Sequence, residues 1–187
     1  MLGAEAIVSK GHLLGTVVAV KKRIEKKYRV KKLDDLLRRE RTKSEARLLH
    51  RAKSTGVLCP VVLEVSEFEI VMSFVSGKRP KIIGKNVRDF GVLLAKLHSA
   101  DIIHGDYTPA NLLQSGSKLY VIDFGLGFVS QDVEDKAVDV FTMLRAIGNN
   151  EKMNNSFLDG YKSVAKDKAE KIFGRVKQVE KRVRYAN

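Results

Sequence analysis

Two short polar segments in the middle of the chain limit its possible folds more than any other feature. The first runs from His104 to Asn111 and reads His-Gly-Asp-Tyr-Thr-Pro-Ala-Asn. The second ends in Asp123-Phe-Gly and follows a stretch typical of a β-hairpin. Each piece is common by itself. Their order, the five-residue interval from Asp106 to Asn111 and the hairpin between them are specific in combination, and they favour one shared catalytic centre.

Phosphoryl transfer explains why these residue types occur together. The reaction requires a carboxylate that orients the attacking hydroxyl group and accepts its proton, and oxygen ligands that hold Mg²⁺ against the phosphates. Asp106 is expected to be this base, whereas Asn111 and Asp123 are expected to bind the metal. Gly125 would let the backbone bend behind Asp123, and Pro109 would stiffen the loop before Asn111. The sequence thus predicts an enzyme that uses ATP and Mg²⁺.

The remainder of an ATP site is expected in the N-terminal part of the chain. Lys21 follows an apolar, β-rich run over 16–20, so its side chain would project toward the nucleotide. Glu45 shares a helical face with Leu48, and an acid on such a face needs a partner, because breaking a buried ion pair costs about 3–5 kcal/mol. We therefore expect a Lys21–Glu45 ion pair that directs Lys21 to the α- and β-phosphates. Pairing of Glu45 with Arg41 on its own helix is the alternative.

The order of extended and helical patterns predicts an α+β fold with two unequal lobes. In chain order we expect strands over 6–8 and 16–20, a helix over 33–54 closed by Gly56, strands over 61–65 and 68–75, a helix from 86 to 97 capped by Asn86, a hairpin turn at 115–117, a helix over 133–147 closed by Gly148, and one or two basic helices from 157 onward. The result is a small β-rich N-terminal lobe with one long helix, and a reduced, mainly helical C-terminal lobe.

Adenine is expected to bind where the last N-terminal strand ends. Backbone hydrogen bonds and apolar walls for the base would come from Met72, Ser73, Phe74 and Val75. The segment 76–80, Ser-Gly-Lys-Arg-Pro, is the expected connection between the lobes. Residues 1–76 would then form the N-terminal lobe and residues 77–187 the C-terminal lobe.

Composition narrows the cellular setting. The 187 residues, 44% of them hydrophobic, suffice for one sizeable core or two small lobes. The sequence contains no unbroken apolar run of the roughly 18 residues that a membrane span needs, and no signal peptide is recognisable at its start. Cys59 is the only cysteine, which excludes intramolecular disulfides. A cytoplasmic protein without a membrane partner is therefore expected.

Charge indicates polyanionic partners. Lys and Arg outnumber Asp and Glu by 35 to 22, which gives a formal net charge of +13. Nucleotides, RNA or acidic protein surfaces suit such a chain, and a solvated basic surface without a specific partner is the alternative. The expected RNA footprint comprises the basic run 21–32, the helix residues Arg38, Arg39, Arg41 and Arg47, and the tail 171–184.

These motifs resemble a known family over nearly the whole chain. The segments that carry the resemblance are Gly3-Ala4-Glu5-Ala6, Lys21-Lys22-Arg23, Lys26-Lys27-Tyr28-Arg29, Arg39-Glu40-Arg41-Thr42, Glu45-Ala46-Arg47-Leu48-Leu49, the run 104–111, the run 123–127 and Glu134-Asp135-Lys136-Ala137-Val138-Asp139. In this order they are similar to the small atypical, PRPK-like kinase subunit of the KEOPS (EKC) complex, a member of the protein-kinase-like superfamily. The family usually closes with a short Arg-Gly-rich tail, whereas this chain ends in a basic segment over 181–187.

The resemblance implies a two-lobed protein-kinase-like fold and a cytosolic, Mg-dependent Ser/Thr kinase or ATPase. It also implies a larger, metal-containing KEOPS subunit as partner and a role in threonylcarbamoyl-adenosine formation on tRNA. By this likeness Gly3, Ala4, Glu5 and Ala6 take the place of a glycine-rich ATP loop, Lys21 contacts phosphates, Asp106 is the catalytic Asp, and Asn111 and Asp123 bind metal. Asp139 is expected to anchor the catalytic loop from below.

Two other functions remain open at this stage. A small-molecule phosphotransferase of the aminoglycoside or choline kinase type would share His-Gly-Asp and the downstream Asn, but such enzymes usually carry additional C-terminal helices. A basic tRNA-binding scaffold with a vestigial nucleotide site would use the same positive surface. Phosphorylation of a sugar or amino alcohol would favour the former, and tRNA binding without ATP turnover would favour the latter.

Overall fold

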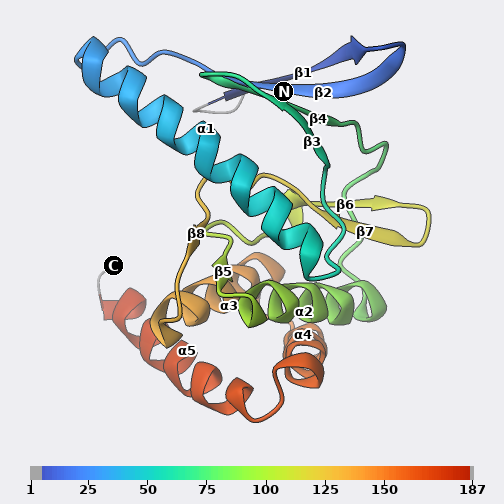
Figure 1. The fold of residues 1–187 in the computed structure, drawn as a ribbon. Helices are drawn as coiled ribbons and strands as arrows, with labels where there is room; N and C mark the ends of the chain where they lie inside the picture. The colour runs from blue at the N-terminus through green and yellow to red at the C-terminus, as the bar shows by residue number, and fades with distance from the viewer. Residues whose placement is uncertain (1–5, 186–187) are drawn as a thin grey trace.

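The computed structural model describes residues 6–185, with the side chains described up to residue 183, and divides them into a sheet-containing lobe and a helical lobe (Figure 1). The first lobe contains β1 (Ala6–Leu13), β2 (Thr16–Arg23), α1 (Lys31–Ser54), β3 (Val62–Val65) and β4 (Glu69–Ser73). The second contains α2 (Gly84–Ser99), β5 (Ile102–Ile103), the 3₁₀ turn η1 (Pro109–Asn111), β6 (Leu112–Ser115), β7 (Lys118–Val121), β8 (Phe128–Val129), α3 (Val133–Ile147), α4 (Glu151–Ala165) and α5 (Lys168–Tyr185). The expected α+β organisation is confirmed.

The four-stranded sheet is antiparallel in the order β1-β2-β4-β3. A two-residue turn joins β1 to β2, and its residues Leu14 and Gly15 have φ angles of 49° and 76°. Positive φ at both central positions is what a type I′ hairpin turn requires, and Gly15 adopts it without steric cost. The register places Lys21 opposite Ile70 of β4, in the interior of the sheet rather than at its edge.

Helix α1 lies against one face of this sheet (Figure 1). Its sequence is rich in Arg, Leu and Lys, which favour helix formation. The inward face buries Leu48, Leu49 and Ala52 near β3 and β4. The helix ends at Ser54 with Thr55 as its C-cap, and Gly56 has a φ of 76°, as the expected glycine stop requires.

Contacts at the C-terminal end of α1 join the two lobes. The backbone N–H of Val121 in β7 donates to the carbonyl oxygen of Leu58 at 2.8 Å. The Arg51 guanidinium donates to the carbonyl oxygen of Ala100, which follows α2, at 2.5 Å. Because both contacts lie close to the end of α1, this helix has a fixed position relative to the β6–β7 hairpin.

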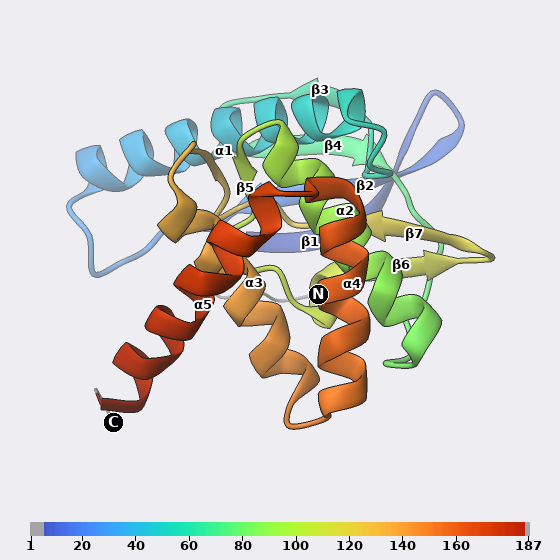
Figure 2. The ribbon, with the colours of Figure 1, turned by 90° about the horizontal axis from the view of Figure 1, so that it is seen from below.

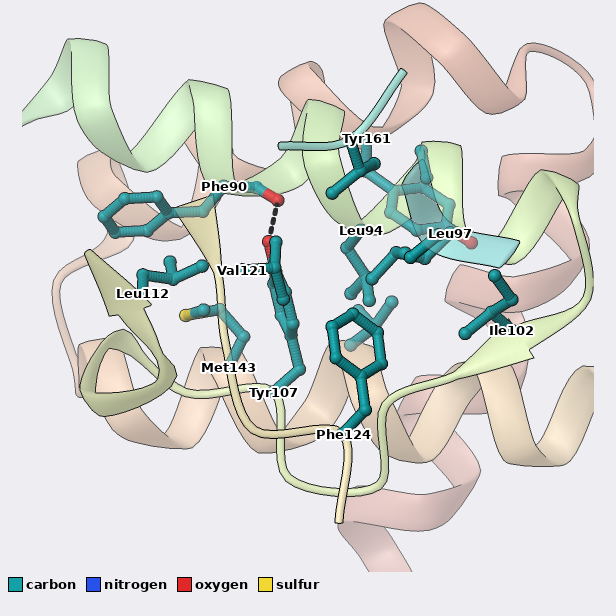
Figure 3. Packing of buried hydrophobic residues seen from close by; sticks show 14 of the residues in the cluster. Phe90, Leu94, Leu97, Ile102, Tyr107, Leu112, Val121, Phe124, Met143 and Tyr161 are labelled. Carbon is teal, nitrogen blue, oxygen red and sulfur yellow. Dashed lines mark hydrogen bonds between the residues drawn. The ribbon is translucent and has the colours of Figure 1, made fainter. Parts of the chain in front are cut away.

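The helical lobe has its core between α2, α3, α4, α5 and the segments that contain Tyr107 and Phe124; Figure 2 shows how these helices are arranged and Figure 3 shows part of the packing. Phe90, Leu94 and Leu97 of α2 are fully buried beside Tyr107 and Phe124 (Figure 3). The Tyr107 hydroxyl group donates to the Phe90 carbonyl oxygen at 2.8 Å, which satisfies the one polar group of this buried ring. The loop that contains Asp106, Tyr107 and Asn111 thus rests directly on the core.

Most expected elements are confirmed, and one helix cap is wrong. The hairpin over 112–121 and the helix α3, with Gly148 at a φ of 84° behind it, occur where the sequence indicated. Helix α2, however, begins at Gly84, and Asn86 lies inside its first turn. The Asn86 amide group donates to the Lys81 carbonyl oxygen at 2.9 Å, so it stabilises the preceding loop instead of accepting from a helix N–H. The lobe boundary after residue 76 stays a prediction.

Among residues 6–185, no helix combines the length and the apolar character that crossing a lipid bilayer requires.

The close approach of α2 and α4 supplies a test of the packing. A Cβ atom built at Gly91 would lie 2.0 Å from the Phe157 carbonyl oxygen. We expect Gly91→Ala to lower the free energy of unfolding by about 1–3 kcal/mol, measured by urea denaturation, because one backbone must move away. Gly174→Ala in α5 is the control, since among the described residues no atom lies within 4 Å of its Cβ; it should stabilise by about 0.5–1 kcal/mol. Equal effects of both substitutions would contradict this packing.

Candidate active site

Lys21 lies at the centre of the candidate site. Its Nζ atom is 2.5 Å from Oε1 of Glu45 and 2.8 Å from Oδ1 of Asp123. Lys21 and Glu45 are buried, with side chains only 8% and 2% exposed, whereas 52% of the Asp123 side chain is accessible. The ion pair expected between Lys21 and Glu45 is therefore present, and it extends to the Asp-Phe-Gly segment. One ammonium group connects the sheet, α1 and the C-terminal lobe.

A second cation binds the other oxygen of Glu45, and the sequence analysis did not single it out. Nη2 of Arg23 lies 2.6 Å from Oε2 of Glu45, and the Arg23 side chain is only 4% exposed. Arg23 follows Lys21 by two positions on β2, so both side chains project from the same face of the sheet. This alternation is the signal that could have distinguished Arg23 from the neighbouring solvent-exposed lysines.

The loop residues Asp106 and Asn111 bind one another. Nδ2 of Asn111 donates to Oδ2 of Asp106 at 2.9 Å and to its carbonyl oxygen at 2.8 Å. The backbone N–H of Ile122 donates to the Asn111 carbonyl oxygen at 3.0 Å, which places Asn111 beside the residue that precedes Asp123. The three oxygen-bearing residues expected at one centre are therefore brought together by the η1 turn and the β6–β7 hairpin.

Asp139 of α3 holds this loop from the interior, as expected. Its carboxylate accepts the backbone N–H groups of His104 and Gly105 at 2.7 and 2.9 Å. Nε2 of His98 lies 3.2 Å from the same carboxylate, and Nδ1 of His98 lies 2.7 Å from the Tyr161 hydroxyl group. A buried carboxylate is stable only when its oxygens are bonded, and these donors satisfy that requirement. The loop is thereby fixed to the helical core through its backbone.

His104 connects the loop to the strand before Asp123. Nδ1 of His104 accepts the backbone N–H of Asp106 at 3.3 Å, and Nε2 lies 3.1 Å from the Ile122 carbonyl oxygen. These partners require a proton on Nε2 and none on Nδ1, which is the neutral ring. Burial lowers the pKa of His104, and the nearby Asp139 carboxylate opposes this change only in part. The sequence analysis treated His104 as part of a motif and gave it no role.

Asp123 has an uncommon backbone conformation, and its carboxylate lies beside a cation. Its φ is 61°, a left-handed conformation that is uncommon for residues other than glycine and often occurs at functional sites. Burial acts to raise the pKa of the Asp123 carboxyl group, but the charge of Lys21 and its hydrogen bond outweigh burial, so the pKa lies below its usual value. Asp123 is therefore ionised at neutral pH.

The residues present fit a nucleotide-bound Mg²⁺. The ion prefers oxygen ligands and shares them with phosphates, and no group of three or more His, Cys, Asp or Glu residues that could hold a metal alone occurs in the described part of the chain. Because the amide nitrogen of Asn111 bonds Asp106, its amide oxygen is directed elsewhere. A Cβ atom at Gly125 would lie 3.0 Å from Oδ1 of Asp123 and 3.4 Å from Nζ of Lys21. A glycine there leaves space beside both charged groups.

The structure describes only some of the residues expected to contact adenine or to form the phosphate-binding loop. Ala6 is buried at the start of β1, whereas Gly3, Ala4 and Glu5 lie outside the described residues. Ser73 uses its backbone N–H and its hydroxyl oxygen to bond the backbone of Val61, both at 2.8 Å. Its N–H group is thus committed to the sheet.

The other three residues of this stretch differ in exposure. Met72 is buried in β4, the Phe74 ring lies 4.5 Å from the Lys10 ammonium group, and Val75 is half-buried. Phe74 and Val75 follow Ser73, the last residue of β4, so their backbone lies outside the paired strand. Their contact with a base stays a prediction.

Comparison with known proteins assigns this arrangement to a family. A family model described as the RIO domain matches residues 14–149. A probable serine/threonine-protein kinase BUD32 homolog of Archaeoglobus fulgidus is 45% identical over 190 residues, which cover 98% of this chain and 94% of that protein. The chain belongs to the RIO-domain family and is a BUD32 homologue.

Longer relatives contain a similar RIO domain as one part. A probable bifunctional tRNA threonylcarbamoyladenosine biosynthesis protein of Methanosarcina mazei is 40% identical over 192 residues, which cover 98% of this chain and 35% of that protein. The protein of the same description from Methanocaldococcus jannaschii is 39% identical over 194 residues. This BUD32 homologue spans about a third of the length of these bifunctional relatives and nearly all of the Archaeoglobus protein.

Solved structures confirm the kinase-like α+β fold of the RIO domain. The Rio2 kinase of Chaetomium thermophilum, in its ADP/Mg²⁺-phosphoaspartate complex, aligns with a TM-score of 0.67 at 17% identity, covering 95% of this chain and 64% of that one. The amicoumacin kinase hAmiN, solved with AMP-PNP, Ca²⁺ and Ami, aligns with a TM-score of 0.66 at 10% identity, covering 88% of this chain and 71% of that one. At such identities the likeness concerns the fold alone.

The buried histidines under the loop predict how stability depends on pH. Burial lowers the pKa values of His98 and His104 below 6.5, more than the Asp139 carboxylate raises them. Below pH 6.5 the unfolded chain therefore binds protons that the folded chain does not, and folding loses stability by up to about 1.4 kcal/mol per pH unit for each histidine. We expect the free energy of unfolding from urea titrations to be constant near pH 7–8 and to fall toward pH 5.

His98→Gln should reduce the change in the free energy of unfolding between pH 7 and pH 5 by the contribution of one histidine. It should also lower the overall stability. The control is His50→Gln on the exposed side of α1, which should leave the change between pH 7 and pH 5 unaltered. A free energy of unfolding that does not change between pH 7 and pH 5 would contradict the neutral, buried state of these rings.

Proposed function

We propose that the chain is a Mg-dependent, ATP-using phosphotransferase of the serine/threonine protein kinase type, or an ATPase, that acts within a KEOPS-type complex. One observation carries the proposal: Lys21 joins a buried Glu45 to a half-exposed Asp123, beside a loop in which Asp106 and Asn111 bind each other. These are the groups and spacings that phosphoryl transfer requires. The likeness to a probable serine/threonine-protein kinase BUD32 homolog and to probable bifunctional tRNA threonylcarbamoyladenosine biosynthesis proteins supports the same function.

Each side chain has a proposed role in the reaction. Lys21 would release Asp123 and bind the α- and β-phosphates while Glu45 retains its position. Asp123 and Asn111 would hold Mg²⁺, which when bound neutralises charge on the phosphates. Asp106 would accept the proton of the attacking hydroxyl group or water, with its carboxylate oriented by Asn111.

The short segment after Asp123 bears on the choice of substrate. Only residues 124–132 separate Asp123 from α3, and they include the two-residue strand β8. A long, separately folded activation segment for docking a peptide is therefore absent from this region. We propose that turnover depends on a partner protein, the larger metal-containing KEOPS subunit, rather than on a peptide-docking surface of this chain.

The surface that we propose for tRNA contains fewer of the basic residues than the footprint predicted from the sequence. Arg38 binds Asp34 and Asp35, and Arg39 binds Glu67, so these arginines of α1 have internal partners. The outward face of α5 carries Lys171, Lys177 and Lys181, all of which are exposed. We therefore propose α5 as the main surface that contacts the RNA backbone. We also propose that residues 1–76 form the N-terminal lobe and residues 77–187 the C-terminal lobe.

A small-molecule phosphotransferase would share the His-Gly-Asp motif, the downstream Asn and the fold with this chain, but further observations disfavour it. The amicoumacin kinase likeness, at 10% identity, concerns the fold, and α4 and α5 complete the described C-terminal lobe without further helices for a substrate pocket. A pure scaffold is disfavoured by the ordered contacts of every expected reactive side chain in the described chain. ATP turnover at the Lys21–Asp123 site and tRNA binding at α5 are compatible, because they use different residues.

Asp123→Ala should abolish Mg-dependent ATP turnover while the fold is retained. Loss of the main metal ligand is expected to lower the rate at least about 100-fold, because charge on the phosphates is no longer compensated. Phosphate release in the presence of Mg²⁺ or EDTA measures turnover, and a melting curve reports the fold. Asp167→Ala, at an exposed position between α4 and α5, is the matched control and should turn over ATP normally. Undiminished turnover by Asp123→Ala would refute the proposed function.

Binding of tRNA should depend steeply on salt and on the lysines of α5. Each phosphate contact contributes about 0.7–0.9 to the slope of log K against log salt. Replacing Lys171, Lys177 and Lys181 by Glu is expected to lower that slope by about 2–3 and to weaken binding, as measured by fluorescence anisotropy. Reversing Lys85, Lys118 and Lys152 instead changes the net charge equally at exposed positions elsewhere. If both triple variants lose the same affinity, binding reflects net charge and not α5.

A further inference from the structure

Glu45 has a cation at each oxygen, and the two cations have different surroundings. Oε1 faces Lys21 at 2.5 Å, and Oε2 faces Arg23 at 2.6 Å. Lys21 is also bound to Asp123, the half-exposed carboxylate that is the proposed metal ligand. Arg23 instead donates to the Arg41 carbonyl oxygen at 3.3 Å, one helical turn before Glu45 on α1. Lys21 thus connects Glu45 to the reaction centre, and Arg23 connects Glu45 to its own helix.

The position of Arg23 allows it to keep this role when Lys21 changes partner. Its backbone N–H donates to the Phe68 carbonyl oxygen at 2.8 Å, and its Cα is paired with Ala6 across β1 and β2. The guanidinium is planar and presents several donors in a fixed geometry, so it can bind a carboxylate and a carbonyl group together. Arg23 therefore fixes Glu45 to the sheet through contacts that do not include Asp123.

A nucleotide would change the balance of charges at Lys21. When Lys21 turns toward phosphates, Glu45 shares its cation with several phosphate oxygens. A buried carboxylate that loses its partner is unstable, so α1 would tend to move and carry Glu45 away. In the described chain, residues 124–132 between Asp123 and α3 are too few for the long activation segment that controls the equivalent helix in many kinases. Another group has to hold Glu45.

We propose that Arg23 is a positioning residue for phosphate binding: it holds Glu45 and α1 in place so that Lys21 can leave Asp123 and bind the nucleotide phosphates. The inference rests on the proposed ATP-using function, which it deepens. A merely structural Arg23 would affect stability and all ligands alike. A positioning Arg23 affects the phosphates of the nucleotide and leaves its adenosine part unaffected.

The test compares three ligands on the full-length chain. Calorimetric titration with adenosine, ADP and ATP in the presence of Mg²⁺ separates contacts to the base and ribose from contacts to the phosphates. For Arg23→Met we expect unchanged adenosine affinity, weaker ADP and ATP binding, and a fall in kcat/KM on the order of 100-fold, because the phosphates are misplaced relative to Asp106 and Asp123. Arg23→Lys keeps the charge but not the fork of donors, so it should fall between the wild type and Arg23→Met.

Two further variants make the result specific. Arg38→Met removes a different, largely buried arginine, which lies on α1 and binds Asp34 and Asp35. This substitution should lower stability without changing the ratio of ATP to adenosine affinity. In a Lys21→Met background, Arg23→Met should cause no further loss of ATP affinity, because the lysine that it positions is gone.

The outcomes distinguish this inference from the proposed function. If the wild-type chain binds no Mg-ATP, the proposed function fails. Suppose that the wild type binds ATP. If Arg23→Met then weakens the binding of adenosine and of ATP by the same factor, Arg23 is structural and the inference is overturned. The same holds if Arg23→Met lowers ATP affinity as much in the Lys21→Met background as in the wild type. Should Arg23→Met not fold, Arg23→Lys decides the question by the same ratio of affinities.

Discussion

A lysine shared between two carboxylates joins the parts of this molecule, and the candidate site depends on it. Lys21 comes from the sheet, Glu45 from α1 and Asp123 from the segment after the β6–β7 hairpin. In a low-dielectric interior Lys21 and Glu45 are stable only when paired. The position of α1 relative to the sheet and to the Asp-Phe-Gly segment is therefore set by charge as well as by apolar packing.

The groups proposed to react are accessible, whereas the groups that hold them are buried. Half of the Asp123 side chain is exposed, but Glu45 is 2% and Asp139 1% exposed. Asp139 holds the backbone of the catalytic loop, and Tyr107 of the same loop packs into the helical core (Figure 3). A small protein can in this way maintain a polar site, because each buried charge has partners and each exposed one lies beside a rigid support.

Local patterns in the sequence were sufficient for most elements and for several contacts. Alternating and helical spacings predicted the hairpins, α1 and α3, and an acid on the inner face of α1 predicted the Lys21–Glu45 pair. The misplaced cap at Asn86 has a local cause as well, because an asparagine amide can donate backward to a loop carbonyl as readily as its oxygen can accept from a helix. Arg23 was hidden in a basic run. Its alternation with Lys21 on β2 indicates that both face the same side of the sheet, but it does not show which residue Arg23 binds.

By itself the sequence determined the order of strands and helices, the segments that carry reactive groups, and the excess of positive charge, because these follow from residue type and short-range periodicity. The tertiary structure alone decided that Arg23 also binds Glu45, that the Ser73 N–H bonds the Val61 carbonyl oxygen, and that Arg39 binds Glu67. Those facts depend on distances between residues far apart in the chain. Whether such residues form an ion pair depends on changes of a few ångströms in the distance between their charged atoms, and no local sequence pattern specifies that distance.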